Sequence, residues 1–149
     1  MRAVVQRVSR ASVTVDGRIV GAIEAGLLVY VGVAKEDAGA DVDYIVEKVL
    51  ALRIFNDEDG KMNRSVAETG GGVLVISAFA LQADARKGRR PSFDAAAELQ
   101  LAERLYIEVC DRLSAGGVDV ARGVFRAHML VESVNDGPIS ILLDSRRLF

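Results

Sequence analysis

The sequence has one cysteine and one histidine, and these scarcities exclude several kinds of chemistry. Cys110 has no partner for an intramolecular disulfide, in agreement with a reducing compartment, and its apolar helical context predicts a buried packing residue. His128 has no second histidine or cysteine nearby, so it cannot complete the usual metal ligand set and gives no basis for a Ser-His-Asp triad. We expect it on a strand face, and we expect no metal and no cofactor.

Long apolar runs are also missing. No run approaches the ~20 residues that a membrane-crossing helix needs. The first ten residues, MRAVVQRVSR, carry arginines where a signal peptide needs an apolar segment. We therefore expect a cytoplasmic protein without a membrane partner. The net charge of −2 does not attract nucleic acid over the whole surface, so any RNA contact must use a local basic patch.

The residues that are present form the pattern of one α/β domain spanning residues 1–149. Residues 41–53 repeat apolar side chains at helical spacing, and a longer helix is predicted after Ser92 or Asp94 as its cap. The other apolar segments are typical of strands: 3–8, 12–15, 18–23, 26–33, 73–81, 118–124, 127–134 and 139–143. We predict a mixed, largely antiparallel, curled sheet with two main helices, which forms a homodimer to cover its apolar faces.

The segment SAFAL, residues 77–81, is the first candidate site, because strand ends are where α/β proteins commonly bind ligands. Small side chains at Ala78 and Ala80 leave the main chain approachable, so the N–H groups of Phe79 and Ala80 can donate to a ligand oxygen. The simpler interpretation is an ordinary strand end whose small residues serve packing.

The segment NDGPIS, residues 135–140, is predicted to turn, because Asn, Asp, Gly and Pro are the residues that turns favour. A plain hairpin turn is the simpler interpretation. The functional alternative is that Gly137 and Pro138 present bare carbonyls as a rigid wall, and the X-Pro bond allows a cis peptide there.

A basic loop follows the SAFAL segment and places four cations within five positions: Arg86, Lys87, Arg89 and Arg90. In a chain of net negative charge these residues are candidate phosphate contacts, and each neutralised phosphate adds roughly one unit of salt dependence. The alternative is a solvated surface loop.

Several blocks together resemble the D-aminoacyl-tRNA deacylase family, also called D-tyrosyl-tRNA deacylases. The blocks occur in order along nearly the whole chain: MRAVVQRVSRASVTVDG, LRIFNDEDGKMN, KGRRPSF and VNDGPISILLDS. The resemblance implies a homodimeric hydrolase that removes D-amino acids, and glycine, from tRNA. It further implies that Gly137-Pro138, in cis, enters the partner's pocket, binds the amino group of the substrate and excludes an L side chain by a clash.

The resemblance also assigns residues. Arg7 is similar to the family arginine that fixes the Gly-Pro segment, and residues 77–80 match the segment that lines the aminoacyl-adenosine pocket, Ser77 and Ala78 included. The family usually has S-Q-F-T-L where this chain has SAFAL, so only main-chain roles carry over at the two alanines. Catalysis is then expected from the N–H groups of Phe79 and Ala80 as an oxyanion hole, with the tRNA 2′-OH positioning water. A second departure, Arg64, has no explanation in the sequence.

The two alanines leave other hypotheses open. One is a homologue that binds aminoacyl-tRNA or a nucleotide but has weakened or lost its chemistry, because Ala78 and Ala80 replace polar residues. Another is a dimeric scaffold without a tRNA role, which only the acidic net charge supports. We prefer the active esterase, because the NDGP segment is intact and the resemblance covers nearly the full length.

Overall fold

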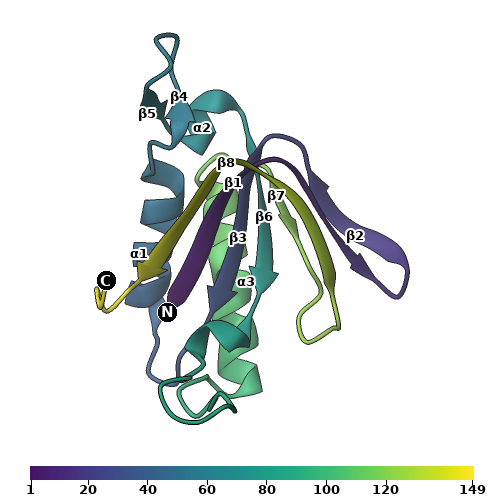
Figure 1. The fold of residues 1–149 in the computed structure, drawn as a ribbon, viewed down its shortest axis with the longest axis vertical. Helices are drawn as coiled ribbons and strands as arrows, with labels where there is room; N and C mark the ends of the chain where they lie inside the picture. Colours follow the sequence, from purple (N-terminus) through teal and green to yellow (C-terminus); the bar gives the residue numbers. More distant parts are fainter.

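Strand β1 (Arg2–Val15) is the centre of the sheet in the computed structural model, which describes residues 1–149. Its first half pairs antiparallel with β3 (Gly26–Gly32) and its second half with β2 (Arg18–Ile23). Strand β8 (Leu130–Asp144) follows the other edge of β1 along nearly its full length. A long strand that serves two neighbours in succession must bend, and Figure 1 shows the resulting curl of the sheet.

Parallel pairing extends the sheet beyond β3. Strand β6 (Gly72–Ser77) pairs parallel with β3, and the short β7 (Val120–Arg122) pairs parallel with β6. The strand order is β2-β1-β3-β6-β7, with β8 on β1, while β4 (Phe55–Asn56) and β5 (Met62–Arg64) form a separate two-stranded sheet. The predicted mixed, largely antiparallel, curled sheet is confirmed.

Helices α1 (Gly39–Ala51) and α3 (Leu99–Ala115) are the two main helices that the sequence predicts. Their apolar stripes enter one core of 22 buried residues shared with the sheet. Burial of each Leu or Ile side chain in this core stabilises the folded chain by about 1.5–3 kcal/mol. Cys110 is buried in this core, as expected. The short α2 (Val66–Thr69) and the 3₁₀ turn η1 (Phe79–Gln82) were not predicted. None of the helices has the length and apolar character that a bilayer crossing requires.

The strand predicted over residues 73–81 is too long. Strand β6 ends at Ser77, because its partner β3 ends one residue after Val31, which is the residue opposite Ser77. A longer strand would leave backbone groups without partners. The chain instead turns into η1, where the N–H of Leu81 donates to the carbonyl of Ala78 at 3.1 Å.

The predicted caps of α3 are also wrong, because the helix begins only after Glu98, whose carboxylate accepts two N–H groups of the first turn. Ser92 closes a local turn instead, and its hydroxyl accepts the N–H of Asp94 at 3.2 Å. The alanines that follow bond to the chain beyond β3, with the N–H of Ala97 donating to the carbonyl of Val33 at 3.0 Å. This pairing keeps the segment extended and delays the helix.

The plain hairpin turn predicted at residues 135–138 is wrong. The two strands expected on either side form one strand, β8, and its pairing with β1 shifts register between Gln6 and Val8 and again between Val8 and Arg10. The turn-forming residues therefore produce a bulge within a strand. His128 is not on a strand face but lies exposed in the loop between β7 and β8.

Candidate functional site

A cavity of about 480 Å³ opens where β6 passes into η1. Its walls come from five separate segments: the residue that follows β3, the end of β6 with η1, the extended chain before α3, the first turns of α3, and the loop between β7 and β8. The lining residues are mostly small or apolar: Val33, Ser77, Ala78, Phe79, Ala80, Ala96, Ala97, Leu99, Ala102, Phe125, Arg126, Ala127 and Met129. The candidate SAFAL residues are thus brought together in one cavity of a size that holds a small ligand.

The first N–H groups of η1 are free. The N–H groups of Phe79 and Ala80 donate neither to a main-chain nor to a side-chain acceptor, whereas Ala78 before them donates to the carbonyl of Val31 at 2.8 Å. The first turn of any helix has such free donors, and here both residues line the cavity. The cavity therefore presents two main-chain donors among apolar walls.

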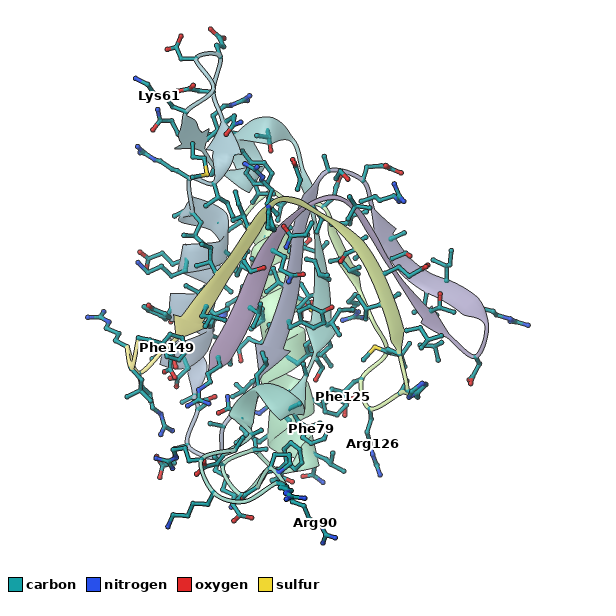
Figure 2. The ribbon with its side chains drawn as sticks, in the orientation of Figure 1. Lys61, Phe79, Arg90, Phe125, Arg126 and Phe149 are labelled. Atoms are coloured by element: carbon teal, nitrogen blue, oxygen red, sulfur yellow. The ribbon has the colours of Figure 1, made fainter.

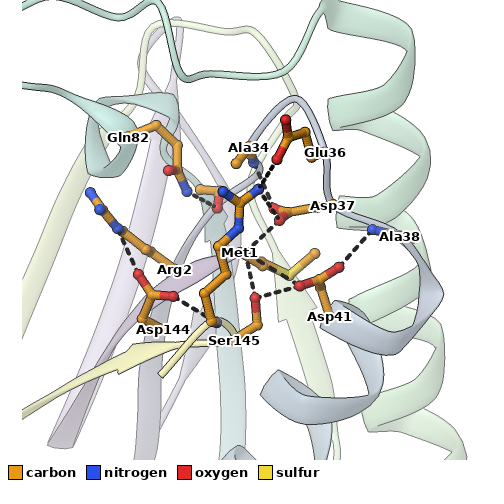
Figure 3. A network of polar contacts seen from close by, with 12 residues as sticks. Met1, Arg2, Ala34, Glu36, Asp37, Ala38, Asp41, Gln82, Asp144 and Ser145 are labelled. Carbon is orange, nitrogen blue, oxygen red and sulfur yellow. Dashed lines mark hydrogen bonds and ion pairs between the residues drawn. The ribbon is translucent and has the colours of Figure 1, made fainter. Parts of the chain in front are cut away.

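Two hydrogen bonds hold η1 in place, and Figure 3 shows Gln82 and Arg2, whose side chains donate them. The buried side chain of Gln82 donates to the carbonyl of Gly32 at 2.7 Å. Arg2 donates through Nη1 to the carbonyl of Leu81 at 3.0 Å and through Nε to Asp144 at 3.0 Å. A Cβ atom on Gly32 would lie 2.8 Å from the carbonyl oxygen of Ala78, so only glycine allows η1 to pack this closely on β3.

The same end of the molecule carries a polar network around the buried α-amino group of Met1 (Figure 3). This group donates to Asp37 at 2.7 Å and to Ser145 at 2.6 Å. Partial burial raises the pKa of Asp41, but hydrogen bonds from Ser145 and from the Ala38 N–H and the charge of the amino group outweigh it, so the pKa is lowered. The first strand, the end of β8 and the start of α1 are thereby tied together beside η1.

No side chain that could act as a general acid or base lines the cavity, where Arg126 is the one ionisable residue. His128 lies in the neighbouring loop but does not line the cavity. Burial raises the pKa of the Cys110 thiol to about 11, so the thiol stays protonated in the core. No three His, Cys, Asp or Glu side chains gather as a metal site would need. Chemistry in the cavity therefore has the main chain, the hydroxyl of Ser77 and the ligand itself to use, without a side chain that exchanges protons near neutral pH.

An exposed aromatic pair stands at the rim. The rings of Phe79 and Phe93 meet edge to face with centroids 4.9 Å apart, and Figure 2 shows Phe79, Phe125 and Arg90 at the same end of the molecule. Exposed aromatic faces beside cations are a common surface for unpaired nucleobases. The predicted basic loop, residues 84–91, leads to this rim.

The four cations of the basic loop are not equivalent. Arg86 donates to both carboxylate oxygens of Asp84, and these hydrogen bonds hold the pKa of Asp84 well below its ordinary range. Lys87, Arg89 and Arg90 are exposed and belong to no ion pair of the structure. Three free positive charges therefore stand near the cavity.

The Gly137-Pro138 bond is cis, and both residues are exposed. The side chain of Asn135 braces the segment, because its Oδ1 accepts the N–H of Ile139 at 2.7 Å and its Nδ2 donates to the carbonyl of Ile139 at 3.2 Å. Gly137 has a φ of +147°, and a Cβ atom there would lie 2.9 Å from the nitrogen of Ile139, so no other residue fits.

Arg7 joins this segment to the body of the domain. Its Nε donates to the carbonyl of Asp136 at 2.8 Å and its Nη1 to the carbonyl of Ile54 at 2.7 Å. The arginine side chain is only 11% exposed, whereas that of Asp136 is 62% exposed. The structure thus places Arg7 in contact with the residue that precedes Gly137.

The structure does not bring Gly137-Pro138 to the cavity of the same chain. The pair lies opposite Arg7, which pairs with Leu27, whereas Ser77 pairs with Val31 at the other end of β3. Leu27 and Val31 are four residues apart along β3, and three interstrand spacings separate β8 from β6. Together these offsets place Gly137-Pro138 roughly 20 Å from Ser77. Figure 1 shows the bend of β8 and η1 at opposite ends of the sheet.

Sequence reasoning missed half of the cavity wall, namely the segments around Ala96, Leu99, Phe125 and Met129. Small apolar residues from distant parts of the chain carry no local pattern that distinguishes a wall from a core. Leu99 carries no such signal either: its helical phase predicts a buried residue, whereas in the structure its side chain is 48% exposed and lines the cavity.

Comparison with known proteins gives a consistent result. The sequence profile of the family described as D-Tyr-tRNA(Tyr) deacylase matches residues 4–144. The D-aminoacyl-tRNA deacylases of Anaeromyxobacter dehalogenans and Koribacter versatilis are 59% and 57% identical over 149 residues, which is the full length of both chains in each case.

Solved structures agree. A protein described as c-Myc DNA Unwinding Element Binding Protein is 39% identical, with a TM-score of 0.92 over 97% of this chain and 98% of that one. A probable eukaryotic D-amino acid tRNA deacylase, at 16% identity and a TM-score of 0.80 over 95% and 97% of the two chains, shares the fold. With a family match over most of its length and full-length relatives above half identity, the chain belongs to the D-Tyr-tRNA(Tyr) deacylase family.

Proposed function

We propose that the chain is a cytoplasmic hydrolase that cleaves the ester bond between a D-amino acid, or glycine, and the 3′ end of tRNA. The observation that carries this proposal is the pair of free N–H groups on Phe79 and Ala80 in a cavity without an acid or base side chain. An ester needs stabilisation of the oxyanion more than it needs a strong base, and two oriented donors contribute roughly 3–4 kcal/mol each to such a transition state.

The reaction needs only water and the substrate. The water oxygen attacks the ester carbonyl carbon, and the carbonyl oxygen becomes an oxyanion that accepts the N–H groups of Phe79 and Ala80. The bond from carbon to the ribose oxygen then breaks, the ribose oxygen takes the proton that water released, and a free amino acid and tRNA result. The neighbouring 2′-OH of the ribose orients the water, because the chain offers no titratable side chain for this task.

Stereochemical selection is assigned to a second copy of the chain. Gly137-Pro138 is exposed, is held by Arg7 and lies roughly 20 Å from its own cavity, so only a partner subunit can bring it to the aminoacyl group. In a homodimer its carbonyls would bind the amino group of a D-amino acid and leave no space for an L side chain. Exposed apolar side chains along β8, those of Leu130 and Leu142 among them, support a covering partner.

The basic loop is the proposed contact surface for the tRNA backbone. Lys87, Arg89 and Arg90 are the free cations of this loop, while Arg86 is bound to Asp84 and contributes less net charge. Ser77 and Ala78 complete the wall against which the aminoacyl-adenosine end rests. In a protein of net charge −2, these local cations orient the tRNA end toward the cavity.

The test offers D-tyrosyl-tRNA, glycyl-tRNA and L-tyrosyl-tRNA separately to the purified protein and follows release of the amino acid. We expect turnover of the first two and none of the third. Equal rates on both enantiomers would contradict the proposed selection. Binding of all three without turnover would favour the alternative of an inactive aminoacyl-tRNA-binding module, which the loss of polar side chains at Ala78 and Ala80 supports.

A further inference from the structure

Arg126 occupies a backbone conformation that suits glycine. It is the third residue of the turn over residues 124–127, which the N–H of Ala127 closes on the carbonyl of Val124 at 3.1 Å. Its φ is +70°, as at the third position of a type II turn, where side chains other than glycine and asparagine are unfavourable. No hydrogen bond or ion pair of the Arg126 side chain accounts for an arginine at this position, and an unfavourable backbone conformation of this kind points to a function for the side chain.

The side chain of Arg126 is available for a ligand. The residue is exposed, lines the mouth of the cavity, and takes part in no ion pair and in no side-chain hydrogen bond. Figure 2 shows Arg126 and Arg90 at the end of the molecule that carries Phe79 and Phe125. Two loops of different origin, one after η1 and one before β8, therefore present free guanidinium groups at this end.

We propose that Arg126 is a phosphate-binding residue for the single-stranded 3′ end of the RNA substrate, which is a role that rests on the proposed deacylase function. With the terminal aminoacyl-nucleoside in the cavity, the preceding phosphates lie at its mouth. A guanidinium binds a phosphate through paired hydrogen bonds. Arg126 and the cations of the basic loop thus contact the RNA from two separate loops. Contacts from two sides orient the RNA end as well as attract it.

The test compares binding of an unacylated tRNA transcript by the native protein and by R126G as the salt concentration is varied. Glycine removes the charge and also relieves the backbone, so R126G is expected to be at least as thermally stable as the native protein. One lost phosphate contact lowers affinity about fivefold at 0.1 M salt and flattens the slope of log K against log salt by about 0.7.

The matched control is R147G. Arg147 is also exposed with a positive φ, of 55°, but lies near the C-terminus and does not line the cavity. We expect R147G to bind tRNA like the native protein, and R126K to keep most of the salt slope. Two results would overturn this inference and leave the proposed function standing, provided that the native protein deacylates D-tyrosyl-tRNA. In the first, R126G keeps the native affinity for tRNA and the native salt slope. In the second, R126G and R147G lose the same amount of affinity. A native protein that neither binds tRNA nor deacylates it overturns the inference and the proposed function together.

Discussion

The substitution Arg7→Lys tests whether Arg7 holds the Gly137-Pro138 segment in the position that selects the substrate. The arginine bridges two main-chain carbonyls, that of Ile54 at 2.7 Å and that of Asp136 at 2.8 Å, and lysine cannot reproduce this fork. Loss of one charge-assisted hydrogen bond in this nearly buried position weakens the hold on the segment by about 1.5–3 kcal/mol. Since every 1.4 kcal/mol is a factor of ten, the preference for D- over L-tyrosyl-tRNA should fall by about 10- to 150-fold.

The assay for Arg7→Lys is single-turnover deacylation of both enantiomers with enzyme in excess. The rate on L-tyrosyl-tRNA should rise and that on D-tyrosyl-tRNA should fall, while the melting temperature falls by at most about 3–12 °C. Arg10→Lys is the control, because Arg10 is exposed on the same strand and its side chain makes no hydrogen bond. Unchanged selectivity in Arg7→Lys, or an equal loss in the control, would refute the reasoning.

Three further predictions concern the core and the cavity. Restoring glutamine and threonine together, A78Q with A80T, should change the turnover of D-tyrosyl-tRNA by less than about tenfold, because the proposed donors are the main-chain N–H groups of Phe79 and Ala80, which both substitutions keep; a rise from background would favour the inactive alternative. Cys110, buried with a pKa raised to about 11, should resist alkylation at pH 8 in the native protein and react once urea unfolds it; rapid native labelling would contradict its placement. Asp37→Asn should lower the free energy of unfolding by about 3–5 kcal/mol, because the buried amino group of Met1 loses its charged partner. Urea titration measures this loss, and a value under about 1 kcal/mol would show that the pair is not buried in solution.

Much of the fold could be predicted because its signals are local. Period-two and helical apolar patterns locate most strands and both long helices, and the stripe around Cys110 enters the core as expected. The errors occur where local and tertiary preferences compete. Ser92 and Asp94 have the chemistry of a helix cap, but pairing of the next residues with the chain after β3 prevents the helix from starting there. Local propensity decides only where no long-range partner is offered.

The candidate site was predictable in part, for a similar reason. The SAFAL segment and residues 135–138 stand out in the sequence, but their distance in space does not, because it depends on the register of β1 with both β3 and β8. Turn-forming residues at Asn135 predicted a hairpin, whereas β1 continues alongside and converts the turn into a bulge. The rim position of Arg126 depends on a turn conformation that its sequence does not favour.

A mixed-dimer experiment tests the central claim, that each site combines the cavity of one subunit with the Gly-Pro segment of the other. A78W blocks the cavity and leaves the segment intact, whereas G137V distorts the segment, since a Cβ there meets Ile139, and leaves the cavity intact. Random pairing of the two inactive variants gives mixed dimers with one native composite site in each, so the mixture should recover about a quarter of the native deacylation rate. No recovery in a mixture that demonstrably exchanges subunits, or a chain that is monomeric and active, would contradict the account.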